Sequence, residues 1–152
     1  MDNFFFSDNA DFVPFSEQHF WVILIISILG SILISFAKKQ PQKIQIIIGN
    51  ILATSICLVI IFGTLLNFHK TNFNYQEDLP LHLCSFLGLI IPVLTYTRKY
   101  IFYEVLLFLI LAGTLQSLIT PSEYNFLNFT FFRYWFVHSG LVIIMLYATF
   151  VY

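Results

Sequence analysis

Five long apolar runs, separated by short polar or charged segments, divide the chain from end to end. We predict helices for these runs, at about residues 20–37, 44–66, 79–96, 101–119 and 131–152. Each run approaches or exceeds the roughly 17–25 residues that cross a ~30 Å hydrocarbon core, and continuous apolarity favours helices over alternating strands. The pattern therefore predicts an all-α fold, a polytopic membrane bundle of five transmembrane helices in one domain, residues 1–152.

The composition of the chain is typical of an integral membrane protein. Hydrophobic residues form 59% of the chain, charged residues only 10%, and the mean hydropathy is +0.84. A soluble domain of this length could not bury so much apolar surface. We therefore expect a multi-pass protein of the cell membrane whose partners are membrane lipids and not nucleic acid. The two cysteines lie far apart in apolar runs and are expected as free thiols, with Cys57 in a packing role.

The charged residues between the runs predict the orientation. Lys38, Lys39 and Lys43 lie in the first connection, and Arg98 and Lys99 lie in the third. The N-terminal tail and the second and fourth connections are net acidic. The positive-inside rule therefore places the N-terminus outside, and the tail lacks the basic start of a signal peptide, so the first span is expected to stay uncleaved.

With this topology, the polar side chains of four helices fall in the outer half of the membrane. At 1.5 Å per residue, four of them lie within roughly 5–11 Å of the outer ends of their helices. Ionisable groups in hydrocarbon are candidates for function, so we predict one shared site; the alternative is that each group caps a helix or satisfies nearby backbone. The residues are His19, His82, Cys84, Ser85, Gln116, Ser117, Thr120, His138 and Ser139.

The third predicted helix carries the cysteine near its start. Asp78 is a suitable N-cap and Pro80 suits a first turn. This start places Cys84 near the positive end of the helix dipole, which favours thiolate, whereas apolar surroundings oppose it. His82 lies two residues away and would point about 200° around the axis from Cys84. We expect the partner of Cys84 to come from another helix, with His138 and His19 as the candidates.

Three further residues have candidate roles beside this pair. Gln116 could orient a histidine or bind a substrate carbonyl oxygen through its amide. Tyr134 precedes His138 by one turn and shares its face. Arg133, at headgroup level, either extends its charge to the interface or holds a lipid phosphate.

Four segments together resemble the YwaF family of bacterial integral membrane proteins: FSEQH at 15–19, LPLHLCS at 79–85, LQSLITP at 115–121 and FRYWFVHSG at 132–140. That family resembles, more distantly, the animal transmembrane protein 164 family, whose members remodel ether phospholipids through a cysteine nucleophile. By position, the resemblance implies Cys84 as that cysteine, His82 as its companion, Gln116 as the fourth-helix glutamine and His138 as the fifth-helix histidine. Family members usually continue for about two further helices, so a second copy or a partner chain is expected to supply them if this chain is a fragment or a reduced form.

Two classes of function follow. In the first, a lipid acyltransferase or thioesterase-like enzyme, Cys84 attacks an acyl ester and His138 or His82 acts as base. Gln116 and backbone groups would stabilise the oxyanion, and Arg133, His19, Ser85 and Tyr134 would contact the substrate. In the second, the chain is a non-enzymatic module: a small transporter, a partner subunit, or a metal-binding protein using His19, His82, Cys84 and His138. Their spacing matches no compact metal motif, and we expect neither a bound metal nor another cofactor.

Overall fold

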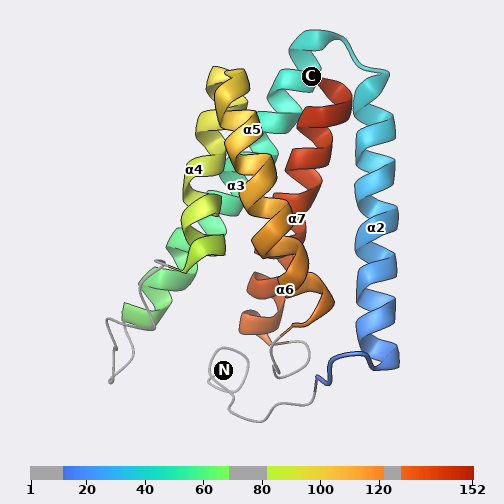
Figure 1. Cartoon of the computed structure of the whole chain (residues 1–152), viewed down its shortest axis with the longest axis vertical. Helices are drawn as coiled ribbons and strands as arrows, with labels where there is room; N and C mark the ends of the chain where they lie inside the picture. Colours follow the sequence, from blue (N-terminus) through green and yellow to red (C-terminus); the bar gives the residue numbers. More distant parts are fainter. Residues whose placement is uncertain (1–11, 69–81, 122–127) are drawn as a thin grey trace.

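The computed structural model describes residues 12–68, 82–121 and 128–152, and its regular elements there are helices (Figure 1). Their order is α2 (Glu17–Lys38), α3 (Gln42–Phe68), α4 (Leu83–Thr97), α5 (Tyr100–Leu109), the π-helical η1 (Ile110–Thr114), α6 (Leu115–Ile119) and α7 (Phe129–Val151). The last three elements before α7 follow one another without a break and form one rod, Tyr100–Ile119. The predicted all-α class is confirmed.

Within the described ranges, four segments are long and apolar enough to cross a membrane: Glu17–Lys38, Gln42–Phe68, Tyr100–Ile119 and Phe129–Val151. Helix α4 is apolar but has only 15 residues. At 1.5 Å per residue it is about 22 Å long, less than the ~30 Å hydrocarbon core. The count of five spans therefore stays a prediction, and residues 79–81 of the third predicted span lie outside the described residues.

The helix starts follow from local capping. Ser16 precedes α2 and its hydroxyl accepts a hydrogen bond from the backbone N–H of His19 at 3.3 Å. Asn128 precedes α7, and its Oδ1 accepts from the N–H of Phe131 at 2.7 Å. Both side chains satisfy amides that a first turn leaves without a helical partner. The beginning of α7 is thus fixed one turn before Arg133.

Helix α4 begins later than the sequence predicted. Its first helical residue is Leu83, and His82 is the N-cap, with extended backbone at φ −60° and ψ 142°. The predicted cap, Asp78, lies outside the described residues. Cys84 is consequently the second residue of its helix and lies closer to the positive end than a start at residue 79 would place it.

Helix α3 forms the centre of the bundle and packs closely against α4 and α7. A Cβ added to Gly88 of α4 would lie 2.3 Å from Ile60 Cδ1, and one added to Gly140 of α7 would lie 2.9 Å from Ile56 Cδ1. Small residues allow membrane helices to approach in this way. The glycines therefore hold α4 and α7 against the same side of α3, near the positions of Cys84 and His138.

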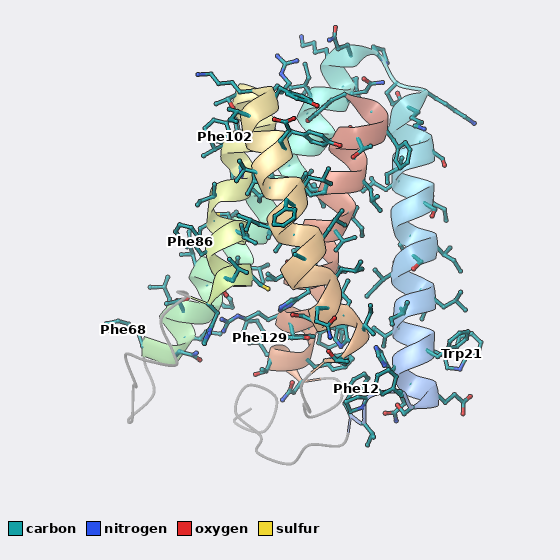
Figure 2. All side chains as sticks on the ribbon, in the orientation of Figure 1. Phe12, Trp21, Phe68, Phe86, Phe102 and Phe129 are labelled. Atoms are coloured by element: carbon teal, nitrogen blue, oxygen red, sulfur yellow. The ribbon has the colours of Figure 1, made fainter. Side chains whose placement is uncertain are left out.

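Helix α2 stands at one side of the bundle, next to α7 (Figure 1). A separate aromatic cluster, Phe12, Phe131 and Trp135, joins the beginning of α2 to the beginning of α7. Figure 2 shows Phe12, Trp21 and Phe129 at the same end of the bundle, opposite Phe102. The polar site lies at this aromatic end.

Candidate functional site

A cavity of about 470 Å³ opens where α4 and α7 begin and α6 ends. We call it the polar cavity. It gathers six of the eight residues to which the sequence assigned a catalytic or substrate-binding role, from two helices that are distant in the chain: His82, Cys84, Ser85, Arg133, Tyr134 and His138. The remaining lining residues are Asn67, Leu83, Ser117, Thr120, Thr130 and Val137. These residues thus share one partly open cavity, which His19 and Gln116 do not line.

Cys84 is half-buried in the first turn of α4. Its Sγ accepts a hydrogen bond from Thr114 Oγ1, at 3.7 Å. The first amides of a helix have no carbonyl four residues earlier, and the side chain of His82 makes no capping bond to them. The sulfur therefore accepts from a hydroxyl, and its residue belongs to a first turn whose amides the His82 side chain does not cap.

The imidazole of His138 has a defined tautomer. Its Nδ1 lies 2.8 Å from the carbonyl oxygen of Tyr134, and a carbonyl oxygen can only accept. The proton therefore resides on Nδ1, which leaves Nε2 with a lone pair for accepting a proton. A histidine held in this way is prepared to act as a general base.

Tyr134 fixes the position of that imidazole. Its ring lies against the ring of His138 with 4.1 Å between centroids. Its hydroxyl donates to the carbonyl oxygen of Ser117 at 2.5 Å, which ties α7 to α6. Tyr134 thus acts on His138 through packing and its own backbone carbonyl, so it is a positioning residue.

Cys84 and His138 do not hydrogen bond to each other. The sulfur is paired with Thr114, and Nδ1 of the histidine is paired with Tyr134. Both side chains nevertheless line the same cavity. Catalytic contacts often form only when substrate is bound, so this arrangement leaves space for a reacting group between nucleophile and base.

A protein-family model, the TMEM164 family, matches residues 14–152. The match includes every described residue of the polar cavity. The chain belongs to the TMEM164 family. No curated protein and no solved structure gives a significant match. Together with the four long apolar helices, membership identifies a multi-pass membrane protein.

Gln116 of this TMEM164-family protein is not in the polar cavity, contrary to its predicted role. Its side chain is exposed, and its Nε2 donates to Thr120 Oγ1 at 3.1 Å. Ser117 and Thr120, which were predicted at the same level, do line the cavity. Adjacent residues of a helix point about 100° apart, so Gln116 does not share the direction of its neighbour Ser117.

Thr114 is the residue that the sequence analysis missed. It is fully buried at the end of η1, where its hydroxyl donates to Cys84. The polar residues predicted on this helix, Gln116, Ser117 and Thr120, did not include it. The available signal was a hydroxyl within an otherwise apolar run. Thr130 and Asn67, which also line the cavity, lie near helix ends and had no stronger signal.

The helical geometry that was used to separate His82 from Cys84 does not hold for His82. Because His82 is the N-cap and has extended backbone, the rotation of about 100° per residue that separates helical side chains does not apply to it. Its exposed side chain lines the polar cavity together with Cys84. His82 thus remains a second candidate for proton transfer.

His19 lies outside the polar cavity and serves a different contact. It is only 3% exposed, its Nδ1 accepts from the N–H of Phe15 at 3.0 Å, and its Nε2 lies 2.9 Å from the carbonyl oxygen of Leu118. These partners fix the neutral tautomer with the proton on Nε2. Both ring nitrogens are used in joining the start of α2 to α6, so His19 is not the partner of Cys84.

The four-ligand metal arrangement is not assembled either. In the part of the chain that the structure describes, no three His, Cys, Asp or Glu side chains are grouped closely enough to hold a metal ion. His19 is separated from the polar cavity that contains His82, Cys84 and His138.

Arg133 extends from α7 across α3. A Cβ added to Gly63 would lie 2.7 Å from its Cδ and 2.9 Å from its Nε. The missing side chain at Gly63 therefore provides the passage for the stem of Arg133, which is half-buried and lines the polar cavity. This places a permanent positive charge beside the cysteine and histidine.

Proposed function

We propose that this TMEM164-family protein is a phospholipid acyltransferase in which Cys84 is the nucleophile and His138 is the general base. One observation carries the proposal: a cysteine at a helix N-terminus shares a polar cavity with a histidine whose Nε2 is available as a base. The motif resemblance to the bacterial YwaF proteins supports placing the chain in that branch and in the cell membrane, with the site in the outer half.

The first half-reaction acylates the cysteine. Nε2 of His138 takes the thiol proton, and Cys84 Sγ attacks the carbonyl carbon of a lipid ester, which moves the carbonyl electron pair onto oxygen. The backbone N–H groups of Cys84 and Ser85, at the start of α4, stabilise the oxyanion in place of Gln116, which does not line the polar cavity. The tetrahedral species then expels the lipid alkoxide, which takes the proton from His138, and a thioester remains.

The second half-reaction returns the acyl chain to a lipid. The hydroxyl of an acceptor lysophospholipid gives its proton to Nε2 of His138 and attacks the thioester carbonyl. The new C–O bond forms as the C–S bond breaks, and the sulfur recovers its proton from the histidine. Thr114 positions the sulfur throughout, and Arg133 binds the phosphate of the lipid by charge-assisted hydrogen bonds.

The acyl-enzyme provides the first test. Purified full-length protein incubated with a phospholipid is expected to gain the mass of one acyl chain, and hydroxylamine should remove it because thioesters are labile to this reagent. Peptide mapping should place the chain on Cys84. Cys57→Ser is the matched control, since Cys57 is the other free thiol and lines no described part of the polar cavity.

Cys84→Ser should abolish the hydroxylamine-labile adduct, and Cys57→Ser should retain it. Acylation that maps to Cys57, or an unchanged adduct on Cys84→Ser, would contradict the assignment of the nucleophile.

A further inference from the structure

A second and larger cavity, of about 820 Å³, lies between α2 and α7 with α3 behind it. We call it the apolar slot. One face of α2 forms its first wall, through Trp21, Val22, Ile25, Ile26 and Leu29, and aromatic residues of α7 form much of the opposite wall. Its volume is within the roughly 300–1,000 Å³ that is usual for small-molecule sites.

The slot is elongated along the helix axes. Its lining on α2 extends from Gln18 to Leu29, which at 1.5 Å per residue is about 16 Å of helix. Apolar side chains line most of this length. Of the polar residues, Ser139 already donates to the carbonyl oxygen of Trp135, and Gln18 and Arg133 lie toward the aromatic end. A long apolar channel with polar groups at one end matches a hydrocarbon tail joined to a polar head.

Arg133 connects the slot to the polar cavity. It lines both spaces, which lie on adjacent faces of the outer part of α7, and its stem is held in place beside Gly63. The junction between the two spaces therefore carries a guanidinium, a group that suits a phosphate.

Trp135 forms part of the slot wall and is only 4% exposed. Its Nε1–H has no hydrogen-bond partner among the described residues, and this atom is buried within the protein rather than exposed in the slot. The part of Trp135 that faces a tail is therefore its apolar ring surface.

We propose that the apolar slot holds one hydrocarbon tail of the phospholipid whose phosphate binds Arg133, while the reacting ester of that lipid faces Cys84. The assignment of the reacting ester rests on the proposed function; the tail site does not. A tail that moves from the bilayer into the slot is already out of water, so the hydrophobic effect does not favour the move. The slot therefore discriminates between lipids by how well their tails pack against its walls.

The slot is open on the side of α2. Trp21, Ile25 and Leu29 line it and are 51%, 53% and 60% exposed. A tail can therefore enter sideways from the bilayer, without passing through the aromatic cluster of Phe12, Phe131 and Trp135.

The test uses a variant that cannot form the thioester. Full-length Cys84→Ser protein is placed in bilayer discs that contain a phospholipid with a photoreactive diazirine near the end of one tail. After illumination, labelled residues are mapped by mass spectrometry. The label is expected on α2 between residues 18 and 29 and on α7 between residues 129 and 143.

A bulky side chain in the slot should block the labelling of α7. Ile25→Trp and Leu29→Trp are each expected to reduce it by about tenfold or more, the discrimination that a misfit of a few atoms causes in an apolar pocket. Ile28→Trp is the matched control, because Ile28 is exposed on the same helix and does not line the slot. Equal losses in Ile25→Trp and Ile28→Trp, or label spread evenly over exposed faces, would show ordinary surrounding lipid and overturn the proposal.

The head group is tested separately. Arg133→Gln should weaken labelling by the phospholipid but not by a diacylglycerol with the same photoreactive tail. Excess glycerol 3-phosphate should weaken the labelling no more than Arg133→Gln does, because it competes for the phosphate site and not for the tail site. Complete loss of label with this headgroup alone would refute a contribution from the tail. Labelling in the slot without any thioester on wild-type protein would refute the proposed function and leave the tail site standing.

Discussion

The chemistry of single residues in the polar cavity depends on which hydrogen bonds they already make. His138 uses Nδ1 for the carbonyl of Tyr134 and keeps Nε2 for a substrate, whereas His19 uses both nitrogens for structure. Cys84 receives a hydroxyl hydrogen bond from Thr114, but this bond leaves the sulfur on the wall of the cavity. The hydrogen bonds that each imidazole already makes thus leave His138 as a candidate base and give His19 a structural role.

Replacing His138 should slow acylation of Cys84 far more than replacing His82. General-base catalysis contributes about 10²–10⁴-fold, so His138→Ala is expected to lower the acylation rate by that range, with a smaller loss for His82→Ala. The measurement is the rate of thioester formation, followed by mass spectrometry under single-turnover conditions. A larger loss in His82→Ala would transfer the role of base to the N-cap histidine.

Some of these residues could be predicted from the sequence and others could not. Cys84 and His138 were identifiable because ionisable groups in apolar runs are rare, and topology placed them at one level. Gln116 was expected at the site and does not line the cavity, because it points about 100° away from its neighbour Ser117, which does. Thr114 was not predicted at all, since the π-helical turn at Ile110–Thr114 that carries it has no clear sequence signal.

At the scale of helices, the packing of α3 against α4 and α7 determines how the nucleophile and the base are held. Ile56 and Ile60 of α3 lie against Gly140 and Gly88. The apolar runs predicted the helices themselves, within a few residues at most ends. The start of α4 was harder to predict. The sequence signals, Asp78 and Pro80, indicated a start near residue 79, whereas the described helix begins at Leu83.

A side chain at Gly140 should force α7 away from α3. Its Cβ would lie 2.9 Å from Ile56 Cδ1 and 3.0 Å from Ile56 Cγ1. Overpacking of this kind costs about 1–3 kcal/mol, so Gly140→Val is expected to lower the thermal midpoint in detergent, measured by circular dichroism.

Ile56→Val provides the matched test, because it removes the Cδ1 atom that the new side chain would meet. Added to Gly140→Val, it should restore part of the lost stability, although alone it costs roughly 0.5–1.5 kcal/mol. Losses that simply add would show that the two residues do not share this contact.

On the scale of the whole molecule, α7 organises both spaces. One of its faces meets α4 and α6 at the polar cavity, the adjacent face meets α2 across the apolar slot, and Arg133 lies at the boundary. The positive-inside pattern predicts that this end faces outward, so lipids of the outer leaflet would be the substrates. Hydropathy predicted a bundle of helices. It did not predict two separate cavities, one polar and one apolar, because these depend on where α2 packs against α7.

The most direct measurement is the transfer of an isotopically labelled acyl chain from a phospholipid to a lysophospholipid, in vesicles that contain the purified full chain. The account predicts transfer by the wild-type protein and by Cys57→Ser, and its loss in Cys84→Ser. Transfer that persists in Cys84→Ser, or its absence from wild-type protein that still binds phospholipid in the slot, would contradict it.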